Sequence, residues 1–123
     1  MVKACLRIRV DFEEGTILSP GKVRLLEMVE QCGSIEEAAA AIQMELDRAQ
    51  LVLRQLEGLF DGSLLEQVGS GSNSQRSRLT ELGRKVVERY RETERASALA
   101  ADRLLAELTS LAPDRHGSDT GSA

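Results

Sequence analysis

The feature that most constrains this fold is a pair of predicted helices connected by only a very short turn. Ser34 and Glu37 have the spacing of a capping box, in which the Ser side chain caps an amide and the Glu reaches back to the Ser amide. They open a helix over 36–42 whose inner side is nearly all alanine, which lets another helix approach closely. Residues 43–44 then lead into a helix over about 45–60 with apolar residues at helical period. This pattern predicts a helix-turn-helix.

A short hairpin and a further helix are predicted before this motif. Residues 6–10 alternate strictly between apolar and polar, which indicates a half-buried strand, and residues 16–18 are its expected returning partner. Ser19 and Pro20 then have the residue types of an N-cap and a first helical position. Gly33 is expected to end the helix that they start.

A second hairpin is predicted after the motif. Residues 64–68 and 76–79 have strand patterns, and the loop between them is rich in Gly, Ser and Asn. Two strands directly after a helix-turn-helix form a wing. We therefore expect a mostly α fold with a small β-wing (α+β), a winged helix-turn-helix that occupies residues 1–95.

A long helix over 80–111 is predicted to follow the wing, with Thr80 as its cap. Its last apolar residues recur at spacings of three and four, as a seam for another helix would. We expect a dimerisation element, and the alternative is that this end folds back on its own domain. The candidate dimerisation residues are Val86, Tyr90, Ala101, Leu104, Leu108 and Leu111. Pro113 should stop the helix, and residues 112–123 are expected to be a disordered tail.

Composition argues against catalysis. The only histidine, His116, lies in the expected tail, and Cys5 and Cys32 lack metal-ligand spacing. We predict no enzyme activity, no cofactor and no metal site. Two Phe, one Tyr and no Trp are too few for a base-stacking platform. Neither a bilayer-crossing apolar run nor a signal-peptide pattern is present, so we expect a cytoplasmic protein that does not bind membranes.

DNA binding is the predicted role of the second helix of the motif, because its first residues enter the major groove in such folds. The expected base contacts are Glu45, Asp47, Arg48 and Gln50, with Arg48 suited to guanine and Gln50 to adenine. The expected backbone contacts are Ser34, Arg76, Arg78, Arg84 and Lys85. The net charge is −4, but the basic residues concentrate after residue 75. The alternative is that these basic residues are solvated surface with pairs such as Arg84–Glu88.

Several stretches make the chain recognisable. A resemblance to the N-terminal domain of the ModE family of molybdate-responsive repressors is carried by Ser19-Pro20-Gly21-Lys22-Val23, Leu25-Leu26-Glu27, Gly33-Ser34-Ile35 and Ala38-Ala39. Further matches are Met44, Arg48-Ala49, Arg78-Leu79-Thr80, Gly83-Arg84 and Tyr90-Arg91, so the resemblance covers about residues 6–95. The outline is shared more loosely with the LysR-type winged helix. The resemblance implies a homodimeric DNA-binding domain in which the third helix reads bases and the wing contacts the backbone.

The chain also departs from the family pattern. It begins its reader helix with Glu45-Leu46-Asp47 where the family has a Ser, an aromatic and basic residues, and its wing loop at 69–75 has no positive charge. Family members carry C-terminal oxyanion-binding modules, and this sequence stops where those would begin. We therefore expect a transcriptional regulator of ModE-like type that lacks the molybdate-binding sensor domain.

A different class of function remains open. A degenerate winged helix without DNA binding would act as a dimeric protein-interaction module, as a homodimer or as a heterodimer with a full-length family member. The acidic residues Glu36, Glu37, Glu45 and Asp47 motivate this alternative.

Overall fold

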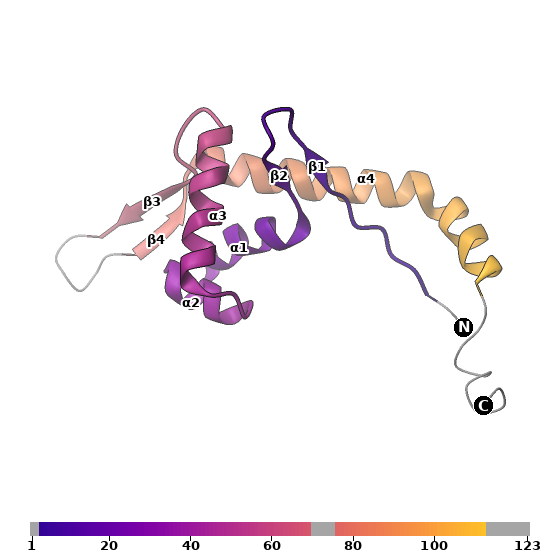
Figure 1. Cartoon of the computed structure of the whole chain (residues 1–123), viewed down its shortest axis with the longest axis horizontal. Coiled ribbons are helices and arrows are strands. Elements are labelled where there is room, and N and C mark those ends of the chain that lie inside the picture. Colours follow the sequence, from indigo (N-terminus) through magenta and orange to yellow (C-terminus); the bar gives the residue numbers. More distant parts are fainter. Residues whose placement is uncertain (1–2, 70–75, 113–123) are drawn as a thin grey trace, which may run out of the picture. The chain divides into compact units, whose positions relative to one another are not determined.

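The computed structural model of the chain describes residues 3–69 and 76–112, and these form two compact units. One unit is Ile8–Arg91, and the other combines Met1–Arg7 with Glu92–Ala123. The elements, shown in Figure 1, are β1 (Val10–Asp11), β2 (Ile17–Leu18), α1 (Pro20–Cys32), α2 (Ile35–Ala41), α3 (Leu46–Leu59), β3 (Leu65–Val68), β4 (Arg76–Leu79) and α4 (Glu81–Leu111). The expected α+β winged helix with a long C-terminal helix is confirmed.

The first hairpin is shorter than expected. Only Val10 and Asp11 pair, opposite Leu18 and Ile17, and residues 6–9 are not strand. The strand predicted over 6–10 is therefore wrong in its extent. The physical reason is that α1 begins at Pro20, so the chain has turned away from the sheet before it can pair with residues 6–9.

Helix α1 starts and ends at the predicted residues. Ser19 is its extended N-cap, although its side chain makes no capping hydrogen bond. Gly33 ends the helix with a φ of 87°, and its N–H donates to the Val29 carbonyl at 2.9 Å. The buried side of α1 consists of Val23, Leu25, Leu26 and Val29, all fully inaccessible. These residues form the centre of the core.

The helix-turn-helix has the predicted short connection. Ser34 caps α2, because its Oγ accepts the Glu37 N–H at 3.0 Å. The Glu37 carboxylate accepts from the Ser34 hydroxyl at 3.2 Å rather than from the Ser34 amide, so the expected reciprocal half of the capping box is replaced. Among the described residues, Gln43 in the turn is the one non-glycine with a positive φ, at 58°.

The wing is an antiparallel hairpin attached to α1. Leu65 pairs with Leu79 and Val68 with Arg76. The Ser77 N–H donates to the Gly33 carbonyl at 2.8 Å, and the Leu79 N–H donates to the Glu30 carboxylate at 2.8 Å. These two bonds fix β4 against the C-terminal end of α1. Of the predicted wing loop 69–75, residues 70–75 lie outside the described residues.

The first part of α4 closes the core of the winged helix. Thr80 caps it as predicted, since its Oγ1 accepts the Gly83 N–H at 3.0 Å. Val86 and Tyr90 are buried, and the Tyr90 hydroxyl donates to the Ile8 carbonyl at 2.7 Å. Arg91 donates to both oxygens of the Glu27 carboxylate, at 3.0 and 2.7 Å. This part of α4 therefore belongs to the winged-helix core.

The second unit contains the last part of α4. Its helix bears three leucines on one side with exposed fractions of 59% for Leu104, 62% for Leu108 and 81% for Leu111. The expected tail, residues 112–123, lies outside the described part apart from Ala112, so its disorder stays a prediction. No helix in the described residues is long and apolar enough to span a membrane.

Candidate nucleic-acid interface

The outer face of α3 is accessible along its length. Ala49, Val52, Leu53 and Leu56 point into the core, so the residues between them lie outward. The expected base-contacting residues Glu45, Asp47, Arg48 and Gln50 are all exposed. Leu46 and Leu51, which are 37% and 42% exposed, lie among them. Exposure alone does not show that these four residues contact bases, so their role stays a prediction.

A groove separates α3 from the wing, which lies beside it in Figure 1. It has a volume of about 460 Å³, and α3 contributes Gln50 and Arg54 while the wing contributes Glu66, Gln67 and Ser77. Amide, guanidinium and hydroxyl groups of this kind can bond base edges and sugar-phosphate oxygens. Sequence reasoning missed Arg54. It lies one helical turn after Gln50, and this spacing of four residues could have indicated that both lie on the same face of the helix.

Three of the expected backbone contacts, Arg78 in the wing and Arg84 and Lys85 in α4, are paired with carboxylates. Arg78 donates to Glu66 across the hairpin at 2.7 Å. Arg84 donates to the Leu79 carbonyl at 3.0 Å and lies 3.7 Å from Glu30, instead of pairing with Glu88. A looser pair joins Lys85 to Glu81 at 3.9 Å. Such half-exposed pairs are worth only about 0–1 kcal/mol, so a phosphate can compete with them.

Two other expected backbone contacts already have structural partners. The Arg76 guanidinium covers Gly33 so closely that any Cβ at that position would overlap it. It thereby places positive charge at the C-terminal end of α1, where the helix dipole favours a cation. The Ser34 hydroxyl is engaged in capping α2. Neither residue is tested as a phosphate ligand, and both stay predictions.

Lys22 interacts electrostatically with two other basic residues, Arg9 and Arg48, of which Arg48 lies in the first turn of α3. The Lys22 ammonium donates to the Ile17 carbonyl at 2.8 Å. Its pKa is lowered from the ordinary value by burial, then by the positive charges of Arg48 and Arg9. Sequence reasoning missed Arg9 and Lys22, because only the folded chain brings them to Arg48.

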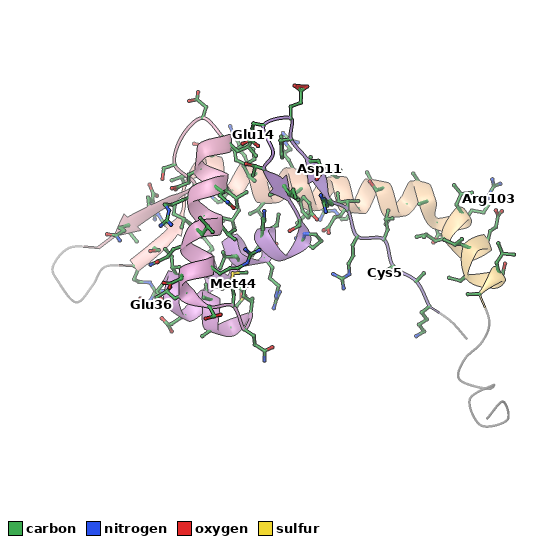
Figure 2. The ribbon with its side chains drawn as sticks, viewed as in Figure 1. Cys5, Asp11, Glu14, Glu36, Met44 and Arg103 are labelled. Carbon is green, nitrogen blue, oxygen red and sulfur yellow. The ribbon has the colours of Figure 1, made fainter. Side chains whose placement is uncertain are left out.

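An acidic surface adjoins the same end of α3. Glu36, Glu37, Glu45 and Asp47 are all exposed, and Figure 2 shows Glu36 projecting from α2 and Met44 at the turn into α3. Carboxylates here repel phosphates, although each can accept from a cytosine amino group. This surface is the main electrostatic obstacle to DNA binding.

The candidate dimerisation residues divide into two sets. Val86 and Tyr90 are buried in the core of their own unit, which leaves little of either side chain for a partner. Ala101 is half-buried, whereas Leu104, Leu108 and Leu111 are exposed. An apolar seam on α4 would therefore depend on the three leucines.

Metal ligands do not gather in residues 3–69 and 76–112, where no group of three His, Cys, Asp or Glu residues is placed to hold an ion. Cys5 is exposed and Cys32 half-buried, and both are free thiols. His116 lies outside the described residues.

Comparison with known proteins found one relative with significant sequence similarity. No family model matches the chain. Over 98 residues, which are 80% of the chain, the sequence is 34% identical to the molybdenum transport protein ModE of Azotobacter vinelandii. The chain covers 36% of the length of that relative. The similarity supports a relationship to the ModE family. It does not test the LysR-like character of the wing or the expected absence of a sensor domain.

Proposed function

We propose that the chain is a DNA-binding transcriptional regulator of ModE-like type, which binds duplex DNA through the winged helix of residues 1–95. The observation that carries the proposal is the exposed polar face of α3 beside the groove of the wing. The similarity to ModE over 98 residues supports it. Because only 36% of that relative is covered, molybdenum transport as such is not carried over.

Base reading is assigned to the outer face of α3. The Gln50 amide suits adenine, and the guanidinium of Arg48 suits guanine, as does that of Arg54, since each can make two hydrogen bonds in the major groove. Glu45 and Asp47 would accept from cytosine. Phosphate contacts are assigned to Ser34, Arg76, Arg78, Arg84 and Lys85, several of which must first exchange a carboxylate partner for a phosphate.

The proposed regulator is a homodimer. The leucines Leu104, Leu108 and Leu111 of α4 follow the four-and-three spacing of a helix-helix seam, and solvent exposure leaves them available to a second chain. We assign residues 80–111 to dimerisation on this ground. A two-fold dimer places two reader helices on half-sites about one helical turn apart.

The test is binding to random duplex DNA, followed by fluorescence anisotropy at about 50 and 200 mM salt. A protein that neutralises several phosphates releases their counterions, so affinity should fall by roughly 10³-fold or more between these two concentrations. Gln50→Ala should then weaken binding to a selected site by about 1–3 kcal/mol while leaving random-duplex binding unchanged. No binding at the lower salt concentration would overturn the proposal.

The acidic surface favours a second candidate function. The exposed carboxylates Glu36, Glu37, Glu45 and Asp47 would suit a dimeric protein-interaction module that has lost DNA binding and pairs with itself or with a full-length family member. This candidate predicts no salt-sensitive DNA binding together with a stable dimer. A monomer at micromolar concentration in analytical ultracentrifugation would contradict it.

A further inference from the structure

We propose that Leu51 of α3 contacts the 5-methyl group of a thymine in the major groove, so that the protein selects thymine at one position of its site. The inference rests on the proposed function, because it names a base that the DNA-binding surface would recognise. It concerns a side chain without charge or hydrogen-bonding groups, and it leaves the contacts assigned to Arg48, Gln50 and Arg54 unchanged.

Exposed large apolar side chains are confined to α3 in the winged-helix unit. Among the described residues of Ile8–Arg91 they are Leu46 and Leu51, with exposed fractions of 37% and 42%. The other large apolar residues described in this unit are buried or half-buried. A scattered exposed leucine needs no explanation, but here both lie on the helix to which base reading is assigned.

The rotation of α3 places Leu51 on the outward side. Ala49 is fully buried, and Leu51 follows it by two residues, which turns it roughly 200° further round the helix and away from the core. Asp47 and Arg54 lie four residues before and three residues after Leu51, so they share its side of the helix. The apolar side chain therefore lies between two polar ones that are assigned to base edges.

Duplex DNA is the occupant that the neighbouring residues support. Leu51 adjoins Gln50 and shares its side of α3 with Arg54, and both of these polar residues line the groove beside the wing. The exposed carboxylates of Glu45 and Asp47 repel phosphates, which directs this part of α3 toward base edges rather than toward the backbone.

Thymine is the base that an aliphatic side chain suits. Its 5-methyl group is the apolar feature of the major-groove edges, whereas guanine, adenine and cytosine present hydrogen-bonding groups there. A leucine that covers one of those groups would leave it without a partner, which is unfavourable. Leu51 should therefore favour thymine and also disfavour the other three bases.

The experiment starts from a duplex site that the protein selects from a random library. Each thymine of the site is replaced in turn by uracil, which lacks the 5-methyl group and keeps the same base pairing. At the contacted thymine the affinity should fall about fourfold, as expected for the loss of one buried methyl group. In Leu51→Ala that uracil effect should disappear, and in Leu51→Met, which keeps an apolar side chain, it should remain.

Leu99→Ala is the matched control, because Leu99 is an exposed leucine of α4 outside the winged-helix unit. It should leave both the affinity and the uracil effect unchanged. Leu51→Ala should keep the fold, since Leu51 is exposed and alanine is a strong helix former. The uracil scan of the unchanged protein needs no variant.

The outcomes separate the two proposals. If the unchanged protein binds no duplex at low salt, the proposed function is wrong. If it selects a site in which no thymine is sensitive to uracil, or if the sensitivity persists in Leu51→Ala, the thymine contact is wrong and the proposed function stands. If Leu51→Ala keeps full DNA affinity but loses self-association in analytical ultracentrifugation, the leucine belongs to a protein interface and the inference is overturned.

Discussion

The substitution Gly83→Ala should destabilise the winged helix, although the same change in most helices is stabilising. Gly83 lies in the first turn of α4, and a Cβ built there overlaps the carbonyl oxygen of Leu64 and approaches Leu79 Cδ2 to 3.2 Å. That carbonyl accepts the Thr80 N–H at 2.9 Å, and Leu64 is fully buried. The backbone of the wing must therefore move away from α4 to admit one methyl group.

The magnitude follows from three terms. Alanine gains about 1 kcal/mol over glycine from helix propensity. Overpacking a close backbone contact costs about 1–3 kcal/mol, and loss of the Thr80 hydrogen bond to Leu64 costs about 1 kcal/mol more. The free energy of unfolding should fall by about 1–3 kcal/mol.

Urea denaturation followed by circular dichroism at one fixed protein concentration measures this change. The matched control is Gly58→Ala in α3, where nothing lies within 4 Å of a built Cβ. That variant should gain about 0.5–1 kcal/mol. If Gly83→Ala is as stable as Gly58→Ala, the close approach of α4 to Leu64 is wrong.

Three other changes test separate features. Gln43→Gly should stabilise the protein by about 1 kcal/mol, because a side chain at a φ of 58° is strained; a loss of stability in urea denaturation would argue against that turn. Tyr90→Phe should cost about 1 kcal/mol by removing the hydrogen bond to Ile8, and unchanged thermal stability would refute the bond. Leu108→Asp should shift the proposed homodimer to monomer in analytical ultracentrifugation, and an unaltered dimer would remove that leucine from the proposed seam.

Local signals account for the parts of the fold that the sequence predicted. Ser19 and Pro20 begin α1 and Gly33 ends it, and each acts through its own backbone preference. The capping residues Ser34 and Thr80 act equally locally. The extent of the first strand was wrong because strand length depends on a partner, and the partner here is cut short by the start of α1.

The candidate site was less predictable, because its electrostatics depend on contacts between distant residues. Arg84 pairs with Glu30 of α1 rather than with a neighbour in its own helix. Burial and the positive charges of Arg48 and Arg9 lower the pKa of Lys22 only in the folded chain. Tyr90 and Val86 have the helical spacing of a seam, and that same spacing also serves burial in the core. A periodic pattern identifies an apolar face but cannot say whether that face meets its own chain or another.

The buried position of Tyr90 gives the molecule a built-in optical reporter. It is the one tyrosine of a chain without tryptophan, so nearly all intrinsic fluorescence excited at long wavelength comes from a single known side chain. Its hydroxyl is held by the Ile8 carbonyl, and its ring is almost fully shielded from water. The emission therefore reports on one junction, between the chain entering the first hairpin and the helix leaving the wing. Denaturant titration followed by tyrosine emission would reveal through that signal any loosening of the junction.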